Sequence, residues 1–132
     1  MDKQKILKEV NAICEYNKHN HIYTVDIGPD YSVVEAELRP ESLNPLGMAH
    51  GGFVYSLCDV AAGVVINQNV GLSVTLSGNV YFMRPGKGTK LRCEGRIIKP
   101  GRTVNVVETC VYDDEGRLTA KGMFELYILE AK

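Results

Sequence analysis

Apolar residues near the start of the chain recur every three or four positions, which is the spacing of one face of a helix. They are Ile6, Val10, Ile13 and Cys14. Asp2 is a suitable cap for the first turn, and Lys18 and His19 suit the negative end of the helix dipole. We expect an N-terminal helix over about residues 2–19.

A two-residue alternation begins after this helix. Residues 21–27 form a short extended piece, and a turn at residues 28–30 leads into residues 31–38, which alternate as in a half-buried strand. The residues expected on one face are Ser32, Val34, Ala36 and Leu38. Two prolines within residues 39–47 predict a loop.

The segment over residues 50–67 is apolar on nearly every side. Its apolar members are Phe53, Val54, Leu57, Cys58, Val60, Ala61, Ala62, Val64, Val65 and Ile66. The segment is long for a strand, and a helix of this composition is buried on most of its sides. We expect a central helix over about residues 50–67.

Strand patterns joined by tight turns fill the chain after Gly71. Over residues 72–83 we expect strict alternation, with Leu72, Val74, Leu76, Val80 and Phe82 facing one way and Ser73, Thr75, Ser77, Asn79 and Tyr81 the other. Residues 89–98 and the last strand also place their apolar side chains on one face. These are Leu91, Cys93, Gly95 and Ile97, and then Leu118, Ala120, Phe124, Leu126 and Ile128.

These elements together predict an architecture. Several antiparallel strands that each carry one apolar face need a cover, and one helix is apolar enough to provide it. The economical solution is a curved antiparallel sheet wrapped around one long central helix, the α+β arrangement known as the hotdog fold. A length of 132 residues suits a single domain over residues 1–132.

Composition and charge argue against several classes of function. Hydrophobic residues make up 45% and charged residues 23% of the chain, which is typical of a folded globular protein. The net charge of −1 provides no global basic field for nucleic acid, and no apolar run approaches the roughly 18 residues of a membrane span. We therefore expect neither nucleic acid nor a membrane as partner.

Cysteine and histidine usage narrows the choice further. The four cysteines form no CxxC pair and are typical of reduced, mostly buried thiols in a cytoplasmic protein. Three histidines do not favour a metal site, and the chain has no GxSxG, P-loop or HExxH motif. We expect neither a metal nor a resident cofactor.

Asp59 is the first candidate for chemistry, because it is the only formally charged residue between His50 and Arg84. It lies within the apolar helix, where burying an unpaired carboxylate costs several kcal/mol. A carboxylate in such a place suits a general base or a nucleophile in a cleft. The alternative is an Asp at a solvent gap or bonded to a backbone amide, and the pattern alone does not separate the two.

Paired glycines follow His50 at the start of the same segment. Gly51 and Gly52 leave backbone N–H groups uncovered by side chains, and the helix dipole adds partial positive charge there. Such a spot would stabilise the negative charge that develops on a thioester oxygen; a glycine turn needed for tight packing is the alternative. A histidine beside glycines more often makes a fixed hydrogen bond, so we interpret His50 as orienting.

Three polar residues and a basic segment complete the candidates. Asn44 reads as a turn residue, and Thr75 and Ser77 as strand hydroxyls. Residues 84–102 carry seven basic side chains against Glu94 alone, which suits the phosphates of coenzyme A or, alternatively, charges that protect edge strands. The seven are Arg84, Lys87, Lys90, Arg92, Arg96, Lys99 and Arg102.

The run NPLGMAHGG at residues 44–52, with Asp59 nine positions after His50, resembles the PaaI-like branch of hotdog thioesterases, the phenylacetate-degradation type. Residues 74–85 and 99–103 are similar to that family's next strand and following hairpin, so the resemblance spans about residues 33–129. It implies hydrolysis of a small acyl-coenzyme A thioester. It also implies a homodimer with shared active sites, assembled as a dimer of dimers.

The resemblance implies a role for each site residue. Asp59 corresponds to the general base or nucleophile, and the Gly51 N–H to the oxyanion donor. Asn44 corresponds to the amide that holds the carbonyl or the water, Thr75 to a hydroxyl beside the carboxylate, and His50 to the residue that orients the turn. The implied substrate contacts are Gly52, Ser77, Arg84, Lys99 and Arg102, although Ser77 stands where many relatives carry an acidic residue.

Three other functions fit parts of the pattern. They are a non-catalytic acyl-coenzyme A binding or sensing module, a hotdog hydratase or dehydratase, and a structural dimer with Asp59 sealed in the core. The complete set of Asn44, Gly51, Asp59 and Thr75 argues against the first, and the place of His50 in the glycine turn argues against the second. Aromatic, hydroxyaromatic and short to medium aliphatic acyl groups are all open, with candidate pocket residues Val54, Tyr55, Tyr81 and Met83.

Overall fold

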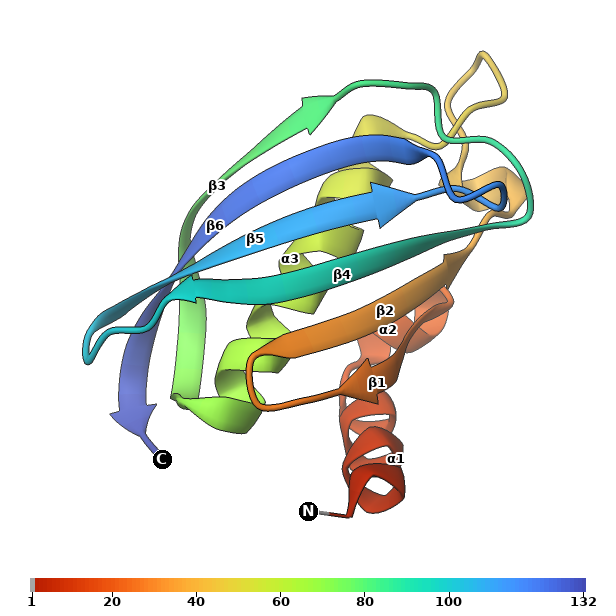
Figure 1. The fold of residues 1–132 in the computed structure, drawn as a ribbon. Helices are drawn as coiled ribbons and strands as arrows, with labels where there is room; N and C mark the ends of the chain where they lie inside the picture. Colours follow the sequence, from red (N-terminus) through yellow and green to blue (C-terminus); the bar gives the residue numbers. More distant parts are fainter. Residues whose placement is uncertain (1) are drawn as a thin grey trace.

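The computed structural model describes residues 2–132, and a six-stranded antiparallel sheet curves around one long helix (Figure 1). The helices are α1 (Lys3–Ile13), α2 (Glu15–His19) and α3 (Gly51–Asn69), with a 3-10 turn at Pro40–Ser42. The strands are β1 (Ile22–Ile27), β2 (Tyr31–Glu37), β3 (Gly71–Phe82), β4 (Lys90–Lys99), β5 (Val104–Tyr112) and β6 (Leu118–Ala131). The strand order is β1-β2-β4-β5-β6-β3, which confirms the predicted hotdog fold.

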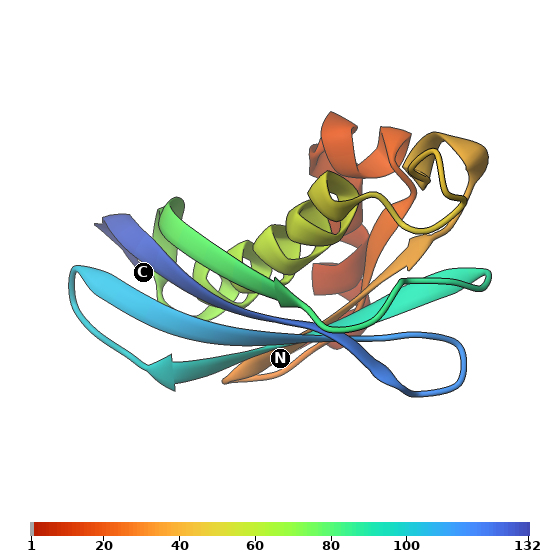
Figure 2. The ribbon, with the colours of Figure 1, turned by 90° about the horizontal axis from the view of Figure 1, so that it is seen from above.

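Helix α3 lies on the concave side of the sheet, as Figure 2 shows from above. Its buried residues are Phe53, Val54, Leu57, Cys58, Ala61, Ala62, Val65 and Ile66. They pack on the inward-facing side chains of the strands, among them Val34, Leu91, Val107 and Phe124. The predicted central helix is confirmed to within two residues, with His50 as its N-cap. Within residues 2–132, no helix has both the length and the apolar character needed to cross a membrane.

Close contacts with β2 and β4 fix the position of α3 over the sheet. A Cβ at Gly95 of β4 would lie 3.0 Å from both the Ala61 carbonyl oxygen and Ser32 Oγ, so the site has little room for any side chain. Ser32 Oγ donates a 2.7 Å hydrogen bond to the same carbonyl. These contacts set the height and the rotation of the helix, and the rotation decides which of its residues face away from the sheet.

The predicted single N-terminal helix over residues 2–19 is wrong in one respect, because the helix breaks at Cys14. This residue is extended, with φ −108° and ψ 108°. The two pieces are tied to different parts of the fold: Asn11 exchanges two 2.8 Å hydrogen bonds with the backbone of β1, whereas the Tyr16 hydroxyl lies 2.8 Å from Ser56 Oγ on α3. One straight helix would not reach both partners.

The two ends of residues 2–19 agree with the prediction from the sequence better than the middle does. The predicted cap is confirmed, since Asp2 accepts a 3.2 Å hydrogen bond from the Lys5 N–H. Lys18 and His19 occupy the last turn of α2, as the helix dipole favours. Ile13, in contrast, is 79% exposed although it belongs to the predicted apolar face.

Strand β3 is an edge of the sheet, and its predicted strict alternation is wrong because of a bulge at Leu76. Thr75 pairs with Leu126 and Ser77 with Glu125, so Leu76 is an inserted residue. A bulge exchanges the faces of the residues on either side of it. Thr75 therefore faces α3, whereas Ser77, predicted on the same face as Thr75, lies on the outer face of the sheet.

We expect Leu57→Ala to lower the free energy of unfolding by about 3 kcal/mol, because Leu57 is fully buried between α3 and the sheet and its truncation leaves a cavity. Leu46→Ala is the matched control: Leu46 is 78% exposed in a loop, and this change should cost less than about 0.5 kcal/mol. Urea unfolding at one fixed protein concentration measures both. Equal losses in the two variants would contradict this packing.

Candidate active site

The first turn of α3 presents a free backbone donor at Gly51. His50 caps the helix, because its Nδ1 accepts the Gly52 N–H at 2.9 Å, which is the fixed hydrogen bond expected from the sequence. The Gly51 N–H has no acceptor within residues 2–132. The helix dipole places partial positive charge on this group. It is therefore available to an oxygen atom of a ligand.

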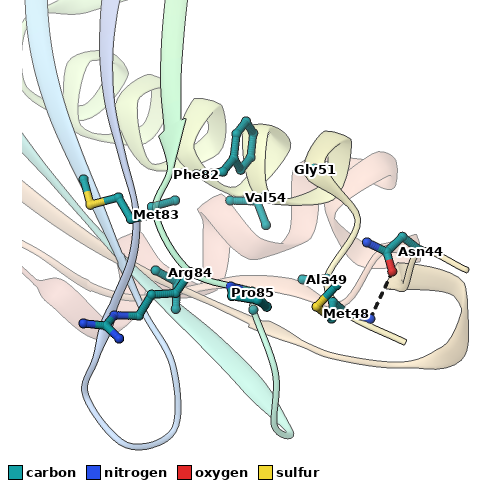
Figure 3. A pocket seen from close by; sticks show the side chains of 12 residues that line it. Asn44, Met48, Ala49, Gly51, Val54, Phe82, Met83, Arg84 and Pro85 are labelled. Atoms are coloured by element: carbon teal, nitrogen blue, oxygen red, sulfur yellow. Dashed lines mark hydrogen bonds between the residues drawn. The ribbon is translucent and has the colours of Figure 1, made fainter. Parts of the chain in front are cut away.

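The loop before the helix carries Asn44, which lines the same cavity as Gly51 (Figure 3). Asn44 Oδ1 accepts the N–H of Leu46 at 2.9 Å and the N–H of Met48 at 3.1 Å. These bonds close a tight turn in which Gly47 adopts a φ of +78°, a conformation that favours glycine. Because the oxygen is engaged by the turn, the side-chain amide nitrogen points away from it as a potential donor.

These two groups open onto a cavity of about 350 Å³, the amide cavity. It lies between the loop, the start of α3 and the chain after β3, and it is lined by Asn44, Met48, Ala49, Gly51, Val54, Phe82, Met83, Arg84, Pro85, Gly86, Thr119 and Ala120 (Figure 3). Most of the wall is apolar, and Arg84 is its one cation among the described residues. Met48 and Phe82 were not among the predicted site residues, because their place depends on β3 ending beside the start of α3.

Asp59 lies in a second cavity, a groove of about 530 Å³ between α3 and the helices α1 and α2. This helix groove is lined by Val10, Ile13, Cys14, Tyr16, Asn17, Tyr55, Ser56, Asp59, Val60, Gly63, Val64, Asn67 and Gln68. Asp59 is half-buried, and its Oδ1 accepts a 2.5 Å hydrogen bond from the Thr75 hydroxyl. Its other oxygen has no partner within residues 2–132. The carboxylate is thus held in place but open to the groove.

The structure therefore groups the predicted site residues into two sets within one chain. Asn44, Gly51 and Arg84 share the amide cavity, and Asp59 and Thr75 lie together at the helix groove. Asp59 lies eight positions after Gly51 on the helix, which amounts to about 12 Å along the axis and about 80° around it. Because a carbonyl bond is only about 1.2 Å long, the two groups of one chain cannot both address one thioester carbonyl.

Ser77 lies at neither cavity, contrary to its predicted substrate contact. Its Oγ donates a 2.5 Å hydrogen bond to Glu125 Oε1 on the outer face of the sheet. Among the predicted pocket residues, Val54 and Met83 line the amide cavity and Tyr55 lines the helix groove, whereas Tyr81 is exposed on the outer face. Ser77 and Tyr81 lie on the face opposite to Val80 and Phe82, as alternation assigns them, and the bulge turns only the part of β3 before it, with Thr75, towards α3.

The basic segment over residues 84–102 is not one continuous patch. Three of its cations are paired with acids, as Lys90–Glu35, Arg92–Glu94 and Arg96–Asp30. Lys99 and Arg102 lie in the β4–β5 hairpin, at the end of β4 opposite to Arg84 (Figure 1). Within one chain, the predicted phosphate contacts therefore reduce to Arg84 beside the amide cavity.

The thiols are structural in this fold. All four cysteines are free, and Cys58 and Cys93 are buried in the core while Cys14 and Cys110 are half-buried. Burial raises the pKa of the Cys93 thiol well above its usual value, because desolvation disfavours the thiolate. Although Cys58 is the neighbour of Asp59 in the sequence, it faces the sheet and not the groove.

The thioesterase superfamily matches residues 46–120, which include Gly51, Asp59 and Thr75. A Saccharolobus solfataricus protein whose name classes it with the esterases is 28% identical over 131 residues, covering 98% of this chain and 91% of the relative.

Two solved structures are similar to this chain. A Streptococcus mutans protein bound to acetyl-coenzyme A is 29% identical, with a TM-score of 0.80 over 84% of this chain and 90% of that one. The Escherichia coli PaaI protein of the phenylacetic acid degradation operon has a TM-score of 0.90 at 18% identity, over 98% and 94% of the two chains. The second likeness concerns the fold alone.

We expect His50→Ala to lower the free energy of unfolding by about 1 kcal/mol, because it removes the acceptor of the Gly52 N–H. His50→Asn supplies another capping oxygen and should recover most of the loss. Urea denaturation of the wild type and both variants at one concentration tests this. If alanine and asparagine cost the same, His50 does not act through the cap.

Proposed function

This chain belongs to the thioesterase superfamily, and from that membership we propose that it hydrolyses a small acyl-coenzyme A at a site shared by two subunits. A thioester hydrolase needs a positioned base or nucleophile, a donor for the oxyanion and a cleft that limits water. The observation that carries the proposal is the hydrogen bond from Thr75 to Asp59, which holds a carboxylate at the open side of an otherwise uncharged helix.

Asp59 is the base or the nucleophile in this proposal. As a base, it takes a proton from a water molecule whose oxygen bonds to the carbonyl carbon, after which the C–S bond breaks and the thiolate takes up a proton. As a nucleophile, its oxygen displaces the thiolate to form an anhydride, which water then hydrolyses. Both routes give a free acid and coenzyme A. Thr75 serves either route, because it fixes one oxygen and leaves the other directed at the groove.

Gly51 and Asn44 are the proposed donors to the thioester oxygen. The Gly51 N–H has no acceptor in the described part of the chain and lies at the positive end of α3, where developing negative charge is stabilised. The side-chain amide of Asn44 opens onto the same cavity, held by its turn. Neither donor has to rearrange during the reaction, so both are already in position to stabilise the oxyanion.

The shared site follows from the edge strand β3. One side of β3 has no neighbouring strand within residues 2–132, and the strand exposes Leu72, Val74 and Leu76. Two copies can pair antiparallel along this edge and bury these side chains. Antiparallel pairing places the half of β3 that carries Thr75 beside the half of the partner's β3 that leads to its amide cavity. Asp59 of one subunit then serves the Gly51 N–H of the other.

Two further features support the proposed assembly and substrate. The outer face of β6 exposes Met123, Tyr127 and Leu129, which supports a second contact and a dimer of dimers. Arg84 gives the amide cavity a cation suited to a phosphate group. The similar Streptococcus mutans protein was solved with acetyl-coenzyme A bound, which supports the same ligand class here.

We expect Asp59→Asn to reduce kcat by about 10³-fold, because asparagine keeps the size and the acceptor for Thr75 but removes the basic oxygen. Asp30→Asn is the matched control, since Asp30 is exposed in a turn and pairs with Arg96. Release of free thiol from acyl-coenzyme A substrates, followed with a thiol-reactive dye, measures both. An unchanged rate constant in Asp59→Asn would remove Asp59 from the mechanism.

Mixing two inactive variants tests the shared site. Asn44→Asp keeps the turn-closing oxygen but removes the donor, and it pairs with Asp59→Asn. After subunit exchange, half of the dimers are mixed and each carries one intact site, so about a quarter of the wild-type activity should return. Thiol release before and after exchange measures the recovery. Activity that stays at the level of the separate variants would place Asn44 and Asp59 of the same chain in one site.

A further inference from the structure

The two cavities differ in charge, and this difference divides the substrate between them. Arg84 lines the amide cavity, whereas Asp59 is, among residues 2–132, the only charged residue that lines the helix groove. Coenzyme A carries phosphates, which favour the side with the cation. The groove is left for the acyl group. We propose that the helix groove binds the acyl group and selects an uncharged, apolar chain of about eight to ten carbons, an inference that rests on the proposed function.

The direction of the acyl chain follows from a bridge at one end of the groove. The Tyr16 hydroxyl on α2 lies 2.8 Å from Ser56 Oγ on α3, and Ser56 Oγ also donates to the Gly52 carbonyl at 2.9 Å. This bridge crosses between the helices about one turn before Asp59. A chain that starts at the carbonyl beside Asp59 is therefore directed the other way along α3, towards Gln68.

The length of the chain follows from the helix that forms the floor. From Asp59 to Gln68 the groove follows nine residues of α3, or about 13 Å. An extended alkyl chain advances roughly 1.3 Å per carbon, given a C–C bond of about 1.5 Å. The groove therefore accommodates about ten carbons. Ile13, whose side chain is 79% exposed beside this path, would be covered by such a chain.

Gly63 controls the width of the groove at its middle. A Cβ at this position would meet only Asn67 Nδ2, at 3.9 Å, so the packing of the fold does not require a glycine here. A larger side chain would stand in the groove without disturbing the core. Because Gly63 lies four residues, or about 6 Å, beyond Asp59, Leu at this position should stop an acyl chain at about five carbons.

The experiment is a series of saturated acyl-coenzyme A substrates from butanoyl to dodecanoyl, assayed by thiol release. For the wild type, kcat/KM should rise by roughly fourfold for each methylene that is buried and level off near ten carbons. Octanedioyl-coenzyme A, which carries a second carboxylate, should be at least about 100-fold poorer than octanoyl-coenzyme A. A length profile that is flat, or an octanedioyl substrate that matches octanoyl, overturns the inference.

Two variants locate the effect in the groove. Gly63→Leu should move the plateau from about ten to about five carbons, and Ile13→Glu should lower the octanoyl-to-butanoyl ratio of kcat/KM at least tenfold. Val25→Glu is the matched control, because Val25 is also an exposed apolar residue but lies in β1, outside the groove. If Gly63→Leu and Ile13→Glu change the sedimentation of the oligomer but not the length preference, the partner subunit occupies the groove and the inference is wrong.

Failure of the proposed function gives a different result from failure of this inference. If no acyl-coenzyme A is turned over, hydrolysis is wrong, and titration calorimetry of the same substrates then decides the inference. Affinity that rises with chain length in the wild type and stops rising at about five carbons in Gly63→Leu supports the groove as the acyl site. Affinity that is independent of length overturns it.

Discussion

The packing of α3 into the concave face of the sheet is the contact on which the rest of the structure depends. A helix that is apolar on nearly every side has no orientation of its own, because several rotations would bury similar amounts of apolar surface. The close approach of Ala61 to Ser32 and Gly95 selects one rotation. With Leu57 and Ala61 against the sheet, Asp59 and Gly63 face the groove, and Gly51 stands at the free end of the helix.

The bulge in β3 completes the environment of Asp59. Strict alternation would place Thr75 on the same face as Ser77, which is the outer face, and would leave the carboxylate without its hydroxyl partner. The inserted Leu76 turns Thr75 towards α3 instead. An edge strand tolerates such an insertion, because a second ladder of hydrogen bonds does not constrain its free side. The same free side is the surface that we propose for the partner subunit.

The placement of the polar groups also weighs on the alternative functions. A structural dimer with Asp59 sealed in the core does not agree with the structure, since the carboxylate opens onto the helix groove. A hydratase that uses His50 as its base would have to release Nδ1 from the Gly52 N–H, where it serves as the helix cap. The Thr75–Asp59 hydrogen bond, which holds a carboxylate at the opening of the groove, favours our proposal over a binding module without turnover.

Much of this protein follows from local patterns in its sequence. The central helix, the strands and the cap at Asp2 depend on residues that are close in the sequence. The spacing of the apolar residues among them indicates which side of each element is buried. Asp59 was identifiable from the sequence because a lone charge in an apolar segment is costly to bury. The start of α3 was identifiable because glycines and a helix N-terminus leave backbone N–H groups free. The sequence thus determined the fold class, most of the elements and the candidates Asp59 and Gly51.

Only the tertiary structure decided how those members are grouped. The break at Cys14 lets α1 and α2 bind different partners, and the bulge at Leu76 belongs to the pairing of β3 with β6. The separation of Arg84 from the hairpin that carries Lys99 and Arg102 depends on which end of β4 each occupies. Contacts between distant segments leave no periodic mark in a sequence. For that reason the two cavities, and the division of the site residues between them, became visible only in the folded chain.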